Sequence, residues 1–179
     1  MTFNLRKQLL FILFPIFLSS AKLAAQVNPE SINWSNFKGR VDSNSPYDAM
    51  THWGANYRYS FTFTSDTVNL KPTATYFLKD ISWVKAAKQS EELLNHERGH
   101  YKFAELIALE FLYEVKKNTY LRSTFKQKLD ALFNTVLKKY TDMEKVYDNE
   151  TKHMLDRQSQ KKWDDFLNER RRHFNQVGN

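Results

Sequence analysis

The sequence of 179 residues contains no cysteine, which excludes disulfides, thiolate metal sites and cysteine-linked lipid anchors. Glycine and proline are also scarce, at four residues each. No proline occurs after Pro72, and after Gly54 only Gly99 interrupts the chain before its C-terminal tail. We therefore expect a strand-rich part at about 30–80, broken by turns, and a helical part at 82–175.

Long hydrophobic runs are absent except at the N-terminus. There Arg6 and Lys7 precede an apolar run at 9–18, and small residues follow it up to Ala25. A short basic segment, an apolar core and small residues are typical of a secretory signal peptide. The run is short for a transmembrane helix. We predict a cleaved signal peptide at 1–25.

The predicted mature chain, 26–179, has the length of a single domain. Cleavage after Ala21 is the second choice, and an uncleaved inner-membrane anchor is a less favoured alternative. Loss of residues 1–25 removes three basic residues and no acid, so the formal charge falls from +7 to +4. No cluster combines Lys or Arg with aromatic residues as a nucleic-acid interface does, and 170–172 is interpreted as a solvated helix end. We expect an exported protein, periplasmic or extracellular, without stable membrane insertion and without a nucleic-acid partner.

The first part of the mature chain shows strand patterns. Aromatic residues alternate with polar ones at 56–64, which predicts a strand with one aromatic face. A short strand and turn are expected at 33–39, a surface loop at 42–47 and a further strand at 73–78. Together with a turn at 65–66, these segments predict a small antiparallel sheet.

Helical periodicity dominates after residue 80. A long helix is expected from Ser82 or Ser90 to Lys117, a second over 121–143 and a third from about Leu155. The predicted fold class is α+β: a small antiparallel sheet followed by about three helices, zincin-like, with the principal motif on the first long helix.

That motif is His-Glu-x-x-His, formed by His96, Glu97 and His100. Residues four apart on a helix lie about 6 Å apart along its axis on one face, so both imidazoles can bind one Zn²⁺. Glu97 falls within the same arc and can take a proton from zinc-activated water. The apolar repeat directs this face to the core, where polar groups need a metal or dedicated partners. Gly99 leaves room there for another segment or for substrate.

A catalytic zinc site needs a third protein ligand. Glu105 lies on the opposite side of the same helix, and Glu110 lies about 15 Å further along its axis. The ligand must therefore come from elsewhere, and an antiparallel second helix would bring its C-terminal end back to the motif. His153 leads on geometry, with Asp148 and Glu150 as carboxylate alternatives. The other interpretation of His153 is a solvated loop histidine.

Motifs spread over most of the mature chain resemble a bacterial family of predicted secreted zinc-dependent proteases, catalogued as a domain of unknown function. They are Trp-Ser-Asn-Phe-Lys-Gly at 34–39, Ser-Trp-Val at 82–84, Leu-Asn-His-Glu-Arg-Gly-His-Tyr at 94–101, and Tyr-Asp-x-x-Thr-x-His at 147–153 followed by Gln160 and Trp163. One departure is Met154, where the family pattern has a small residue, often glycine.

The resemblance implies zinc ligands at His96, His100 and His153. It also suggests that Asp148 accepts a hydrogen bond from a ligand imidazole, and that Tyr147 donates to the oxyanion formed on a peptide carbonyl. The structural alternatives are that Tyr147 is the last core residue of the second helix and that Asp148 caps the third.

We therefore expect a secreted or periplasmic zinc metallopeptidase that hydrolyses peptide bonds with Glu97 as general base. A peptide or protein substrate would add as a strand to an exposed edge, which we place at 73–78. The alternative from another class is a non-catalytic envelope binding or assembly protein stabilised by zinc. A third possibility is hydrolysis of another amide, such as a peptidoglycan cross-link.

Overall fold

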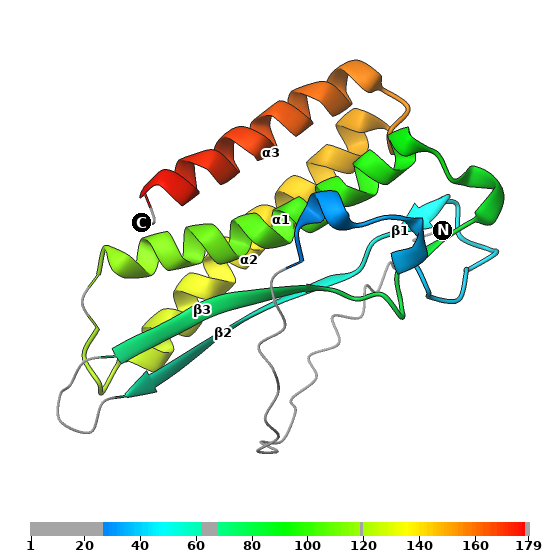
Figure 1. The fold of residues 1–179 in the computed structure, drawn as a ribbon. Coiled ribbons are helices and arrows are strands. Elements are labelled where there is room, and N and C mark those ends of the chain that lie inside the picture. The colour runs from blue at the N-terminus through cyan, green and yellow to red at the C-terminus, as the bar shows by residue number, and fades with distance from the viewer. Residues whose placement is uncertain (1–26, 62–67, 119, 178–179) are drawn as a thin grey trace, which may run out of the picture.

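The computed structural model describes residues 27–61, 68–118 and 120–177 (Figure 1). Within these residues, antiparallel strands are followed by three packed helices, which confirms the predicted α+β class. The elements are η1 (Pro29–Ser31), η2 (Trp34–Asn36), β1 (Ala49–Met50), β2 (Trp53–Phe61), β3 (Val68–Phe77), β4 (Trp83–Val84), η3 (Ala86–Lys88), α1 (Glu91–Lys116), α2 (Phe125–Thr151) and α3 (Arg157–Val177). The predicted signal peptide at 1–25 and turn at 65–66 lie outside the described residues.

The strands form one interrupted antiparallel hairpin. β2 pairs with β3 from Trp53 opposite Phe77 to Phe61 opposite Val68, with an irregularity between positions 56 and 58. After a break in each arm of the hairpin, β1 pairs with β4. The strand predicted at 56–64 is β2 as far as Phe61 and begins earlier, at Trp53, whereas positions 62–64 lie outside the described residues. The strand predicted at 73–78 is the end of β3.

The short strand predicted at 33–39 is wrong, because this segment contains the 3₁₀ helix η2. The Asn33 side chain accepts hydrogen bonds from the backbone N–H and the hydroxyl of Ser35. The Asn36 side chain accepts from the backbone N–H of Asn33 in return. Such local bonds offer the backbone an alternative to strand pairing. The loop predicted at 42–47 is correct.

The start of α1 and the end of α2 are each defined by a capping hydrogen bond. α1 begins after Ser90, whose hydroxyl accepts from the N–H of Leu93, so Ser90 rather than Ser82 is the N-cap. α2 extends to Thr151, eight residues beyond the predicted end. It stops at Lys152, which has a left-handed conformation with φ 50° and donates its N–H to the Asp148 carbonyl.

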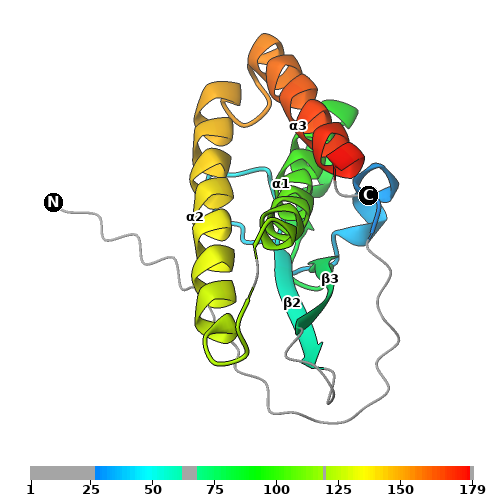
Figure 2. The same cartoon turned by 90° about the vertical axis from the view of Figure 1, so that its left-hand side faces the viewer.

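α1 is the central element of the molecule. Figure 2 shows it between α2 and α3, with the β2–β3 hairpin on a third side. Phe103, Ala104 and Ile107 are fully buried on it. The aromatic face predicted for β2 is present, since Tyr57 packs on Phe111 of α1. Because α1 is covered on several sides, polar groups on it are buried as well.

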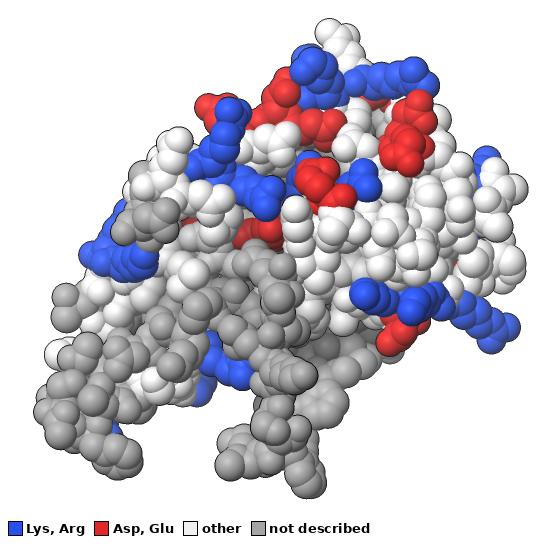
Figure 3. Space-filling model, viewed as in Figure 1, with Lys and Arg blue, Asp and Glu red and all other residues white. Residues whose placement is uncertain are grey.

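None of the helices in the described part of the chain is long and apolar enough to cross a membrane. On the face shown in Figure 3, acidic and basic side chains lie side by side. Ion pairs between exposed side chains include Lys161 with Asp165 on α3 and Arg157 with Glu92.

Candidate metal centre

His96 and His100 lie on one face of α1, with ring centroids 5.0 Å apart. Each ring has its Nδ1 atom next to an acceptor from another helix. His96 Nδ1 is 3.1 Å from Gln160 Oε1 of α3, and His100 Nδ1 is 3.0 Å from Glu144 Oε1 of α2. Acceptors of this kind fix the tautomer and orientation of metal-binding histidines. They leave both Nε2 atoms available on the side where α2 approaches α1.

Both Nε2 atoms face the same carboxylate oxygen, Asp148 Oδ1. The distances are 3.4 Å from His96 and 3.1 Å from His100. Burial raises the pKa of Asp148, but its proximity to the two imidazoles outweighs burial, and the net pKa is lowered. Burial lowers the pKa of His100, yet Asp148 and Glu144 together hold it well above the usual range.

This cluster fits a metal ion. Ligand atoms of His96, His100 and Asp148 all lie within 4.8 Å of one another. Asp148 Oδ1 is buried, and no hydrogen bond of normal geometry reaches it within the described residues. A buried carboxylate oxygen in that situation is costly unless a cation satisfies it. Two imidazole nitrogens and one carboxylate oxygen suit Zn²⁺ and also suit other first-row metals.

Glu97 lies next to this cluster on α1 and is 4% exposed. Its Oε2 atom is buried and has no hydrogen-bond partner among the described residues. The Thr51 hydroxyl donates to the Glu97 carbonyl, at 3.3 Å, so the segment between β1 and β2 covers this part of α1. His52 follows in the same segment. Burial lowers the pKa of His52, and the Glu97 carboxylate opposes that shift.

His153 lies at the rim of the cluster. Its side chain is 46% exposed, and its Nδ1 is 3.7 Å from Asp148 Oδ1. Its ring packs on Tyr47, at 4.8 Å between centroids. The three-residue metal group therefore contains Asp148 and leaves out the predicted ligand His153. The other carboxylate alternative, Glu150, accepts a hydrogen bond from Trp163 instead.

The turn that carries His153 has an unusual backbone. Lys152, His153 and Met154 have φ of 50°, 52° and 81°, a region that glycine adopts without strain. Met154 is the position where the family pattern has a small residue. The departure at Met154 therefore falls on a residue whose conformation suits glycine.

Tyr147 is fully buried, and its hydroxyl is held by two hydrogen bonds. It donates to the His96 carbonyl at 2.9 Å and accepts from Gln160 Nε2 at 2.8 Å. Its ring stacks on the His96 ring at 4.6 Å. A Cβ atom on Gly99 would lie 2.3 Å from this hydroxyl, so the space left by Gly99 is filled by α2. These contacts favour the structural interpretation of Tyr147 over a role as oxyanion donor.

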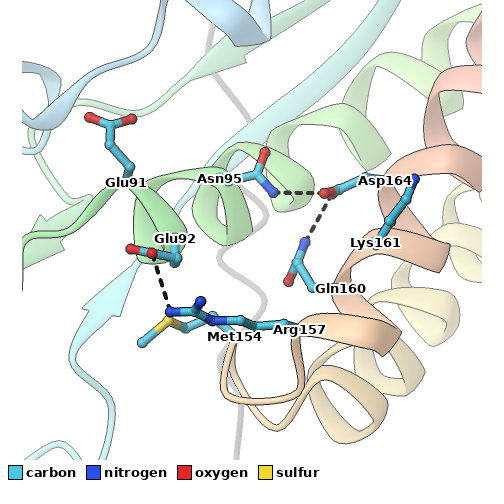
Figure 4. A pocket seen from close by; sticks show the side chains of 8 residues that line it. All are labelled: Glu91, Glu92, Asn95, Met154, Arg157, Gln160, Lys161 and Asp164. Carbon is cyan, nitrogen blue, oxygen red and sulfur yellow. Dashed lines mark hydrogen bonds and ion pairs between the residues drawn. The ribbon is translucent and has the colours of Figure 1, made fainter.

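A cavity of about 310 Å³ lies between the N-terminal ends of α1 and α3 (Figure 4). Its lining is Glu91, Glu92, Asn95, Met154, Arg157, Gln160, Lys161 and Asp164. Gln160 connects this cavity to the metal centre, because its amide oxygen contacts His96.

The sequence interpretation assigned no role to Glu144 or Gln160. Glu144 accepts from both His100 and the Trp53 indole, so it links α1, α2 and β2. Its spacing offered a signal, since Glu144 and Asp148 are four residues apart and share one face of α2. Gln160 lies on α3, and its signal in the sequence was its place among the family motifs after 147–153.

Comparison with known proteins gives one family match. Neither the curated proteins nor the solved structures contain a match to this chain. The matched residues, 25–154, include β1–β4, α1 and α2 and thus His96, His100 and Asp148, whereas α3 lies outside them. The family is described as a bacterial protein of unknown function, DUF922, and the chain belongs to it.

Proposed function

We propose that this protein is an exported zinc metallopeptidase in which His96, His100 and Asp148 hold the metal and Glu97 is the general base. One observation carries the proposal. Atoms of His96, His100 and Asp148 that could bind a metal lie within 4.8 Å of one another, and next to the histidines on α1 a buried Glu97 oxygen has no hydrogen-bond partner within the described residues. A catalytic zinc site combines three protein ligands with an open position and a nearby base. Export rests on the N-terminal signal pattern at 1–25.

The protein residues then have distinct roles. Zn²⁺ held by His96, His100 and Asp148 would supply Lewis acidity toward water and a peptide carbonyl. Glu97 Oε2 receives a proton from the water while the water oxygen attacks the carbonyl carbon of the peptide. It returns that proton to the amine nitrogen as the C–N bond breaks. Glu144 and Gln160 hold the two imidazoles through Nδ1, so the histidines need no reorientation.

An extended peptide is the proposed substrate, bound along the strand segment beside the centre. The predicted edge at 73–78 belongs to β3, which lies on the far side of β2 from α2 (Figure 2). The start of β2 is closer, because Trp53 donates to Glu144 and Thr51 contacts Glu97. We therefore move the proposed edge from 73–78 to 49–53, where main-chain groups would recognise an added strand.

A second candidate is a non-catalytic protein that zinc stabilises. The position of His153 favours it, because Nδ1 lies only 3.7 Å from Asp148 Oδ1. A fourth protein ligand would close the site, as in structural zinc centres. An envelope binding or assembly role would then replace catalysis.

Zinc content separates these assignments. We expect the purified exported protein to bind one zinc per chain and the variant Asp148→Asn to bind it much more weakly. His153→Ala should retain most of the affinity, and His173→Ala, at an exposed position on α3, is the matched control. If His153→Ala loses zinc while Asp148→Asn keeps it, His153 is the third ligand and the assignment of Asp148 is wrong.

Catalysis is tested with Glu97→Gln. We expect unchanged zinc affinity and a fall in peptide hydrolysis of about 10²- to 10⁴-fold, the usual contribution of a general base. Hydrolysis that survives in zinc-loaded Glu97→Gln contradicts the mechanism. The second candidate, a zinc-stabilised binding protein, predicts a different result. The wild type would be saturated with zinc and unfold on chelation, but it would hydrolyse no peptide or peptidoglycan amide.

A further inference from the structure

The amide of Gln160 on α3 is fixed in one orientation. Its Nε2 atom donates to the Tyr147 hydroxyl at 2.8 Å and to Asp164 Oδ1 at 2.9 Å. The other oxygen of Asp164 accepts from Asn95 Nδ2 at 2.8 Å, so both carboxylate oxygens act as acceptors (Figure 4). A flipped amide would direct its oxygen at the Asp164 carboxylate and lose two hydrogen bonds. The amide oxygen of Gln160 must therefore face His96.

This orientation decides which nitrogen of His96 carries the proton. An amide oxygen only accepts, so the contact of 3.1 Å requires a proton on His96 Nδ1. The neutral ring then has a free lone pair on Nε2, the atom that faces Asp148 and His100. The Tyr147 hydroxyl is consistent with this arrangement, since it donates to the His96 carbonyl and uses a lone pair to accept from Gln160.

We propose that Gln160 is a positioning residue for the metal: it holds His96 in the tautomer that can bind through Nε2, and α3 is thereby part of the metal centre. The inference rests on the proposed metal site and deepens it. Gln160 belongs to the sequence motifs that carry the family resemblance, although the family match itself ends at residue 154. His100 differs, because its Nδ1 acceptor is the carboxylate of Glu144 on α2, within the matched residues.

A purely structural role for Gln160 makes a different prediction. Gln160 is 7% exposed, and its neighbours are packed. If it only filled space, methionine at this position would preserve the site, whereas a buried glutamate beside Asp164 would disrupt it. The proposal predicts the opposite: glutamate preserves the site better than methionine does. Glutamate still accepts from His96 Nδ1, whereas methionine removes the strong acceptor and leaves the proton free to move to Nε2, next to Asp148.

Zinc affinity and the His96 tautomer are the two measurements. Affinity is measured by chelator competition in wild type, Gln160→Glu and Gln160→Met, with Gln158→Glu and Gln158→Met as matched controls at an exposed position of α3. We expect Gln160→Met to weaken zinc binding by about 10- to 100-fold, Gln160→Glu to stay close to wild type, and both controls to be unchanged. Asp164→Asn added to Gln160→Glu should restore any stability lost through carboxylate repulsion.

The tautomer is read from ¹⁵N resonances of the His96 ring in zinc-free protein at mildly alkaline pH. We expect the proton on Nδ1 in wild type and on Nε2 in Gln160→Met. A proton on Nε2 in wild type, or a loss of zinc affinity in Gln160→Glu as large as in Gln160→Met, overturns the proposal. The wild-type spectrum decides even if a variant fails to fold. None of these readouts needs hydrolysis, so an inactive protein with the expected tautomer contradicts the proposed peptidase and leaves this inference standing.

Discussion

Gly99→Ala tests how closely α2 approaches the motif helix. Gly99 lies between the two histidines, and an added Cβ would be 2.3 Å from the Tyr147 hydroxyl oxygen and 2.8 Å from Cζ of its ring. Non-bonded heavy atoms prefer separations of about 3.5–4.0 Å, so the Tyr147 ring must move by about 1 Å or more. The hydroxyl is fully buried and bonded to the His96 carbonyl and to Gln160, so the ring cannot move without loss.

The magnitude follows from three contributions to the free energy of unfolding. Replacing a helical glycine by alanine stabilises by about 1 kcal/mol when the site is open. Overpacking of a buried site costs about 1–3 kcal/mol. Loss of the two hydrogen bonds of the Tyr147 hydroxyl costs about 1 kcal/mol each. We expect Gly99→Ala to be destabilised by about 2–4 kcal/mol in urea unfolding of zinc-free protein.

A double-mutant cycle with Tyr147→Phe isolates the contact. Removing the hydroxyl takes away the nearest atom, although the ring carbon at 2.8 Å remains. The double variant Gly99→Ala, Tyr147→Phe should therefore be more stable than the sum of the single changes predicts, by about 1 kcal/mol or more. A Gly99→Ala protein more stable than wild type by about 1 kcal/mol would refute the reasoning, because Gly99 would then be an open helical glycine.

Burial raises the pKa of Glu105 from 4.5 to about 7. The folded state therefore binds this proton more tightly than the unfolded state does. The free energy of unfolding should fall by up to about 3 kcal/mol as pH rises from about 4.5 to 7. Urea unfolding of Glu105→Gln should show a flatter dependence of stability on pH in this range. Free zinc at about one hundred times its Kd should stabilise wild type by about 2.7 kcal/mol and leave His96→Ala unaffected, as followed by thermal unfolding before and after chelation. Trp53→Phe removes a hydrogen-bond donor to Glu144 and should weaken zinc binding less than tenfold in chelator competition.

The part of the candidate metal centre that lies within one helix could be predicted from sequence. His96, Glu97 and His100 share a face because of the helical repeat, and this repeat depends only on local geometry. The identity of the third residue depends on where α2 ends. The sequence pattern ended this helix near residue 143, which left Asp148 and His153 together in a connection. Because α2 continues to Thr151, Asp148 faces α1 from a helix, whereas His153 lies in the left-handed turn beyond it.

Contacts between helices and local capping could not be predicted in the same way. The Nδ1 acceptors Glu144 and Gln160 come from two different helices, and their meeting with α1 depends on how all three pack. The segment 33–39 combines aromatic residues, which favour strands, with Asn, Ser and Gly, which favour turns. The side chains of Asn33 and Asn36 accept backbone hydrogen bonds and fold it into η2. Local hydrogen bonds between side chains and backbone override the weak preference of a short segment for strand conformation.

Glu97 differs from the other buried acids of α1, and the difference bears on function. Glu110 accepts hydrogen bonds from Lys139, Tyr140 and Arg170. Glu105 has the Arg171 guanidinium 3.2 Å from its Oε2. Glu97 is about as buried, yet its Oε2 has no partner within the described residues and no basic side chain pairs with it there. Glu105 Oε2 also lacks a hydrogen bond within the described residues, but it has an ion pair, whereas Glu97 has neither there. An unpaired buried carboxylate oxygen beside two histidines costs about 1–3 kcal/mol. Of the three buried acids of α1, Glu97 is therefore the one that best fits the proposed role of general base.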